Sequence, residues 1–193
     1  MSLQEIINVI NKEYTPLSQE CQQEFINNAK LLSVPRGEIL VKEGQLSSKA
    51  YFIVRGCARA FYLKNGKDVS DWFAFQNDFI SAIVSFFGDK PSPHYIEILE
   101  DSLLIEISKE DIEELATKYR DFESLIRIVV TKTMLGQQER IAAILFQTAE
   151  QKYDNLLKIY PDITQKIPLT HIASYLGITL ETLSRIRNPK YKI

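Results

Sequence analysis

The first half of the chain changes from helical spacing of its hydrophobic residues to short apolar runs. Hydrophobic residues recur at helical spacing in residues 2–14, and residues 17–32 are expected to be helical as well. Between residues 34 and 108, turn residues separate the short apolar runs, and Asn65-Gly66 is the dipeptide most typical of a tight hairpin. The expected strands are residues 39–41, 50–54, 57–63, 72–75, 79–84, 95–99 and 103–107. Strands this short and regularly spaced favour a compact antiparallel barrel or sandwich.

Helical spacing returns after the strand region. Residues 121–148 lack proline and long turn clusters, so they can form one helix of about 42 Å. The a and d positions of its heptad carry Leu125, Ile128, Leu135 and Ala142. Such a repeat is typical of a dimer seam. Apolar residues also occupy neighbouring faces of this helix, so a long core helix within one subunit is the alternative interpretation.

Residues 149–193 contain two short helical patterns joined by a glycine. Pro168 suits the first turn of the first helix, and Gly177 suits the position just past its end. Thr179 is a candidate N-cap for the second helix, whose Leu183 is expected to face inward. This arrangement predicts a helix-turn-helix, and the polar outer face of its second helix can meet base edges and phosphates. A helical hairpin with a polar outside is the alternative.

Charge is distributed unevenly, although the net charge is only −2. Residues 1–150 hold sixteen Lys and Arg against twenty-two Asp and Glu, whereas residues 151–193 hold seven against three. An acidic body with a basic C-terminal segment favours a polyanionic partner for that segment. A solvated surface face would produce the same imbalance.

Composition and motifs argue against several classes. The longest apolar run is the six residues Ile141–Phe146, far below the ~20 that a membrane helix needs, and the N-terminus resembles no secretory signal. We therefore expect a cytoplasmic protein without a membrane partner. Two cysteines cannot form a disulfide framework or a structural zinc site, and no nucleotide-binding, metalloprotease or serine-hydrolase motif occurs. We expect no catalytic activity, metal or cofactor. Cys57, between Arg55 and Arg59, is either a redox-sensing thiol or, more simply, a packed strand residue.

Four segments resemble the Crp/Fnr family of bacterial transcription regulators. Pro35–Glu38, Phe52–Gly56 and Asn77–Ile80 are similar to turns and strands of the family's cyclic-nucleotide-binding jelly roll. Glu181–Arg185 is similar to the family's recognition-helix signature. The resemblance implies an α+β fold: an N-terminal double-stranded β-helix (jelly roll) with flanking helices, a long dimerisation helix and a C-terminal helix-turn-helix DNA-binding domain. The implied domain boundaries are residues 1–120, 121–148 and 149–193.

The resemblance also implies a homodimer that binds a palindromic DNA site, with half-sites about 34–36 Å apart. Glu181 and Arg185 would read base edges, and RNA polymerase is a further candidate partner. Leu180 stands where cAMP-responsive members keep an arginine, so the base preference at that point should differ. The residues expected to contact DNA are Thr170, Thr179, Leu180, Glu181, Thr182, Ser184, Arg185, Arg187, Lys190 and Lys192.

The phosphate cassette of the family's cyclic-nucleotide binders is missing here. Those proteins carry a Gly-Glu pair and, further along, an Arg followed by a hydroxyl residue, whereas the aligned residues are Ser81-Ala82-Ile83 and Ser92-Pro93. A cyclic phosphate buried without its arginine would be an unpaired, desolvated charge. We therefore expect no binding of cAMP or cGMP. If the protein has a small-molecule effector, we expect its pocket to be formed by Phe79, Ile80, Ser81, Ala82, Ser92 and His94. The effector is unidentified, and the alternative is that there is none.

The C-terminal residues Asn188–Ile193 leave no room for the β-hairpin wing that most family members carry. We therefore expect DNA affinity to depend on Arg187, Lys190 and Lys192 at the phosphate backbone, with strong salt dependence. The alternative function is a ligand-binding signalling module that has lost effective DNA binding.

Overall fold

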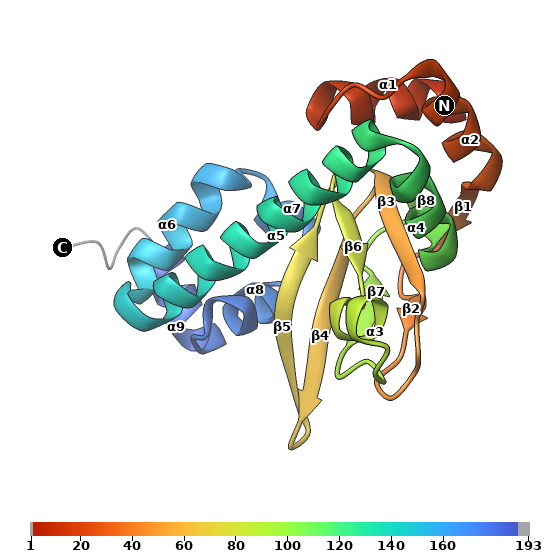
Figure 1. Cartoon of the computed structure of the whole chain (residues 1–193). Coiled ribbons are helices and arrows are strands. Elements are labelled where there is room, and N and C mark those ends of the chain that lie inside the picture. The colour runs from red at the N-terminus through yellow and green to blue at the C-terminus, as the bar shows by residue number, and fades with distance from the viewer. Residues whose placement is uncertain (1, 189–193) are drawn as a thin grey trace.

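The computed structural model describes residues 2–188, so the expected DNA contacts Lys190 and Lys192 lie outside the described residues. Figure 1 shows a β-rich body with α1 and α2 at one end, and α5 running from this body to the C-terminal helices. The strands are β1 (Lys30–Val34), β2 (Ile39–Val41), β3 (Lys49–Arg55), β4 (Ala58–Lys64), β5 (Lys67–Ala74), β6 (Phe79–Ser81), β7 (Tyr95–Ile98) and β8 (Ser102–Ser108). The helices are α1 (Leu3–Glu13), α2 (Gln19–Asn28), α3 (Ile83–Gly88), α4 (Lys109–Lys118), α5 (Arg120–Phe146), α6 (Ala149–Ile159), α7 (Ile163–Lys166), α8 (Leu169–Leu176) and α9 (Leu180–Arg187).

Two four-stranded antiparallel sheets form the body, in the orders β1-β8-β3-β6 and β2-β7-β4-β5. Successive strands alternate between the sheets except at the β4–β5 hairpin, which is the arrangement of a jelly roll. Asn65 and Gly66 turn this hairpin with φ angles of 53° and 73°, the left-handed values that a two-residue turn requires. The α+β jelly-roll prediction is confirmed.

Three expected elements differ in the structure. The predicted helix over residues 17–32 ends at Asn28, because β1 pairs along its length with β8. The predicted strand over residues 79–84 stops at Ser81 and is followed by α3. Strand β5 begins at Lys67 instead of Trp72, because it pairs back along β4 directly from the hairpin turn. At β1, pairing with the distant strand β8 overrides the local helical pattern.

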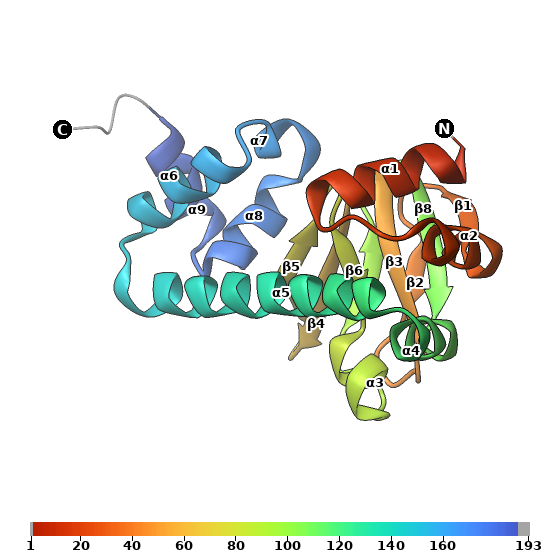
Figure 2. The ribbon, with the colours of Figure 1, turned by 45° about the horizontal axis from the view of Figure 1, so that its top comes forward.

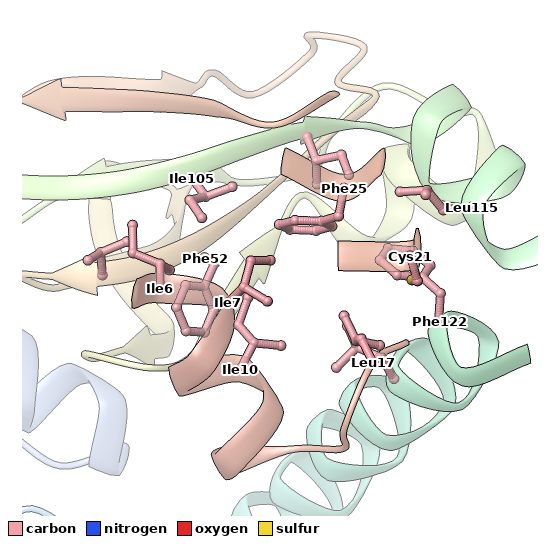
Figure 3. Close-up of a cluster of buried hydrophobic side chains, with 13 residues drawn as sticks. Ile6, Ile7, Ile10, Leu17, Cys21, Phe25, Phe52, Ile105, Leu115 and Phe122 are labelled. Atoms are coloured by element: carbon pink, nitrogen blue, oxygen red, sulfur yellow. The ribbon is translucent and has the colours of Figure 1, made fainter. Parts of the chain in front are cut away.

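Side chains from α1, α2, α4, α5 and the β1-β8-β3-β6 sheet form the first hydrophobic core. Figure 3 shows the three isoleucines of α1 in one cluster with Phe52 and Ile105 of this sheet, Phe25 of α2 and Phe122 of α5. A second core fills the space between the two sheets. Burial of these aliphatic and aromatic side chains holds the N-terminal helices and the start of α5 on the jelly roll.

Helix α5 has 27 residues, and only its first part is buried in its own subunit. Leu125 is 2% exposed within the first core, whereas Leu135 is 53% exposed. The predicted dimer seam therefore needs a correction at Leu125, because this side chain packs inside its own subunit and cannot reach a partner helix. Ile128 and Ala142 are half-buried. The exposed apolar stripe lies on a different face, and it consists of Val130, Met134, Ile141 and Leu145.

The C-terminal helices share a third core with the jelly roll. Cys57, Phe73 and Leu99 of the body pack with Tyr153 of α6 and Ile172 of α8, among others. The C-terminal region is therefore docked on the body and does not hang free at the end of α5. Among residues 2–188, no helix is both long enough and apolar enough to cross a membrane.

Candidate DNA-binding surface and interdomain contacts

Helices α8 and α9 form the expected helix-turn-helix. Gly177 ends α8 with φ of 66°, and its N–H donates to carbonyls of the last turn, as in the common C-terminal capping motifs. The Thr179 hydroxyl caps α9 by accepting from the Thr182 N–H at 3.1 Å. Leu183 is fully buried and packs with Ile172 and its neighbours in the third core. These contacts fix α9 against α8 with one face turned outward.

The outward face of α9 carries the polar side chains of the predicted DNA-binding set. Among the described members of that set, Thr182 alone is half-buried. The exposed members are Thr170, Thr179, Leu180, Glu181, Ser184, Arg185 and Arg187. Backbone hydrogen bonding in the first turn of α9 and the Thr179 hydroxyl hold the pKa of Glu181 below its usual range, so this carboxylate is charged at neutral pH and can accept hydrogen bonds.

A buried arginine joins the jelly roll to the helix-turn-helix. Arg59 of β4 has a side chain only 4% exposed. Its guanidinium binds both carboxylate oxygens of Asp68 at 2.7 Å and reaches Glu97 at 2.7–2.8 Å. The same group lies 2.9 Å from Nδ1 of His171 on α8 and 4.1 Å from the ring centre of Phe61. Two carboxylates thus offset the cost of burying this cation, and the guanidinium still reaches α8.

The protonation of His171 is coupled to this arginine. Burial is the main cause that lowers the pKa of His171, and the positive charge of Arg59 lowers it further, whereas Asp68 and Glu97 act in the opposite direction. A neutral imidazole can accept a hydrogen bond from the guanidinium at Nδ1. The contact therefore favours uncharged His171.

Two further contacts attach α8 to β5, the edge strand of its sheet. The Ser174 hydroxyl accepts from the Ser70 N–H at 2.9 Å and donates to the Asp68 carbonyl at 3.0 Å. Arg140 of α5 donates to the carbonyls of Ser70 and Tyr175 at 3.1 and 3.3 Å, and its guanidinium lies 4.8 Å from the Tyr175 ring centre. Arg140 therefore links the long helix α5 to both the jelly roll and α8.

Five of the six residues of the predicted effector pocket are buried. The Ser92 hydroxyl donates to the His94 carbonyl at 2.7 Å, so it is already satisfied. His94 is 4% exposed, lies edge-on to Tyr62, and has no hydrogen-bond partner at either ring nitrogen among residues 2–188. The other buried members of the predicted set are Ile80, Ser81 and Ala82. Phe79 is half-buried and lines a cleft elsewhere in the molecule.

Cys57 is a packed core residue that directly precedes β4, one position before the strand begins. It is fully buried in the third core. Burial, reinforced by Glu100, raises the pKa of its thiol to about 12, so the reactive thiolate that a redox sensor needs is disfavoured. Among residues 2–188, no group of three or more His, Cys, Asp or Glu side chains is arranged to hold a metal ion.

Sequence reasoning missed the Arg59 network and the Arg140 contacts. Arg59 was noted only as a neighbour of Cys57. An available signal was its position within an otherwise apolar strand, because a charge there needs buried partners. The partners come from β5, β7 and α8, and no sequence pattern brings these segments together.

The described residues thus form a two-sheet jelly roll, a 27-residue helix and a helix-turn-helix. Residues 31–119 match the family model described as "Cyclic nucleotide-binding domain". The fumarate and nitrate reduction regulatory protein of Vibrio cholerae is 24% identical over 165 residues, which cover 79% of this chain and 65% of that protein. The chain thus matches just under two-thirds of that relative's length.

Solved structures share the fold. FixK2 from Bradyrhizobium japonicum aligns with a TM-score of 0.70 at 18% identity, covering 82% of each chain. A protein of Eubacterium rectale described as a regulator of the Crp/Fnr family aligns with a TM-score of 0.68 at 17% identity, covering 88% of this chain and 82% of that one. By its domain match, its relatives and its fold, this chain is similar to transcription regulators of the Crp/Fnr family.

Proposed function

We propose that this protein is a sequence-specific DNA-binding transcription regulator that acts in the cytoplasm as a homodimer on a palindromic DNA site. The observation that carries the proposal is the exposed polar face of α9 above its buried Leu183. Arg185 can pair bidentately with guanine, and Glu181 can accept from a cytosine amine. Arg187, together with the lysines beyond the described residues, supplies positive charge for the phosphate backbone.

The apolar stripe on α5 supports the homodimer. Val130, Met134, Ile141 and Leu145 are between 42% and 66% exposed. They lie four, seven and four residues apart, which places them on one face of the helix. A second copy of α5 packed against this stripe would remove it from water, and two-fold symmetry would then present two recognition helices to a palindrome.

The second part of the proposal is that the protein does not respond to cyclic nucleotides through the usual phosphate contacts. Ser81 and Ala82 are buried where cyclic-nucleotide binders keep Gly and Glu. Ser92, at the position of the cassette arginine, is 2% exposed and hydrogen-bonded to the His94 backbone. A cyclic phosphate at this position would lose its hydration without gaining a cationic partner.

The experiment is a selection of random and genomic duplexes by the purified, ligand-free protein at two salt concentrations. Enrichment of a palindrome, with binding that weakens steeply as salt rises, supports the proposal. Binding without any enriched sequence, or no binding, contradicts it for the free protein and favours a signalling module without effective DNA binding. Titration with cAMP by calorimetry tests the second part, because micromolar binding would contradict it.

A further inference from the structure

A cleft of about 790 Å³ lies between α5, the jelly roll and the C-terminal helices α6 and α8. This volume falls within the range of small-molecule sites. Of the effector pocket expected in the jelly roll, Phe79 lines this cleft, whereas Ile80, Ser81, Ala82, Ser92 and His94 do not. Figure 2 shows α5 extending along both the jelly roll and the C-terminal helices, so a molecule bound in the cleft would contact both.

Most of the cleft wall is apolar and aromatic. The jelly roll contributes Trp72 and Phe79, and the C-terminal helices contribute Leu156 and Tyr160. Helix α5 adds the aliphatic side chain of Ile144. Binding of a ring or an alkyl chain to such a wall is favourable, because it removes apolar surface from water.

Two of the acids that line the cleft are already neutralised by cations. Asp71 pairs with Arg140 at 3.3 Å, and Asp78 pairs with Lys132 at 3.3 Å. Because these two carboxylates are already paired with cations of α5, they offer no free negative charge to a cationic ligand.

Two lysines of α6 have no carboxylate partner among the described residues. Nζ of Lys152 donates to the Leu176 carbonyl at 3.2 Å, and Nζ of Lys158 donates to the Asn155 side chain at 3.2 Å. Both lysines line the cleft, and Glu139 of α5 is its remaining acid. The C-terminal wall therefore carries positive charge that no acid of α6 or α8 in the cleft offsets.

We propose that the cleft binds an organic anion with an apolar body, whose charged group lies beside Lys152 and Lys158 and whose ring or chain packs on the aromatic wall. The proposal goes beyond the DNA-binding function and does not depend on it, because it concerns a small-molecule site that exists whether or not α9 reads DNA.

The first test measures binding of 8-anilinonaphthalene-1-sulfonate, an aromatic anion, by fluorescence titration of the full chain. Gly136 lines the cleft, and no heavy atom lies within 4 Å of the position of an added Cβ. Gly136→Leu therefore adds a side chain to the cleft wall at a position where its Cβ has room, and it favours helix. Gly88→Leu is the matched control, because Gly88 also has open space and lies on α3, away from the cleft. We expect about tenfold weaker probe binding for Gly136→Leu, which corresponds to about 1.4 kcal/mol, and no change for Gly88→Leu.

The second test identifies the charge that the site prefers. Decanoate, decanol and decylamine compete with the probe, and decanoate is expected to displace it at the lowest concentration. The double variant Lys152→Gln with Lys158→Gln should weaken decanoate about fivefold, as for exposed charge pairs, and leave decanol unchanged. Wild-type probe affinity in Gly136→Leu, or equal competition by decylamine, overturns the proposal. So does loss of the probe signal in Leu145→Ser, because Leu145 lies on the outer stripe of α5 and not in the cleft.

Discussion

Replacement of Arg59 by methionine tests how the C-terminal region is held on the jelly roll. The change keeps a long apolar stem but removes a guanidinium that contacts Asp68, Glu97 and His171 from a position 4% exposed. Removing one partner of a buried ion pair typically costs about 3–5 kcal/mol. Because the Asp68 and Glu97 side chains are 35% and 22% exposed, water partly solvates them, and we take the cost as about 3 kcal/mol.

For a chain of this size, 1 kcal/mol corresponds to about 2–4 °C in Tm. The expected loss for Arg59→Met is therefore about 6–12 °C, measured by circular dichroism at pH 7.5. Arg55→Met is the matched control, because Arg55 is exposed at the end of β3, and a surface change of this kind costs at most about 0.5 kcal/mol. Equal Tm values for the two variants would refute the reasoning.

Three further predictions follow from single sites. Burial and Arg59 lower the pKa of His171 in the folded chain. Its stabilising contribution is therefore present above the unfolded pKa of about 6.5 and is lost as pH falls below that value. The Tm should fall more steeply from pH 6.5 to 5 in the wild type than in His171→Gln, and parallel curves would contradict this. Gly56→Ala should lower the free energy of unfolding by about 2–4 kcal/mol in urea titrations. The reason is that φ of Gly56 is +105° and the added Cβ would lie 2.0 Å from the Ser102 hydroxyl oxygen. An unchanged urea midpoint would contradict this prediction. Cys57 should resist iodoacetamide at pH 8 until urea unfolds the chain, because burial raises its pKa to about 12; rapid labelling of the native protein, read by mass spectrometry, would contradict this.

Local chemistry in the sequence was sufficient to predict the elements that depend on short-range signals. Asn65-Gly66 predicted the β4–β5 hairpin because its left-handed turn needs those residue types. Gly177 and Thr179 predicted the end of α8 and the start of α9. Glycine readily adopts the left-handed conformation just past a helix, and a hydroxyl side chain favours the N-cap position. These two boundaries set where α9 begins, and the helical register from that point predicted its polar outer face.

The remaining features depend on contacts between distant segments. The apolar run after Ser81 fits a strand as well as a short helix, and α3 forms there despite the strand prediction. The heptad of α5 placed Leu125 on a dimer seam, because the pattern does not reveal that this side chain is buried in a core shared with α2 and α4. Arg59 and His171 are separated by 112 positions, and only the docked fold brings them together.

The most direct test of DNA reading by α9 is to repeat the duplex selection with Arg185→Ala beside the wild type. We expect a palindrome for the wild type and, for the variant, loss of preference at one base pair in each half-site with a penalty of about 1–3 kcal/mol. Other positions of the palindrome should keep their preferences. An identical motif and affinity in the variant would contradict the assignment of α9 as the recognition helix.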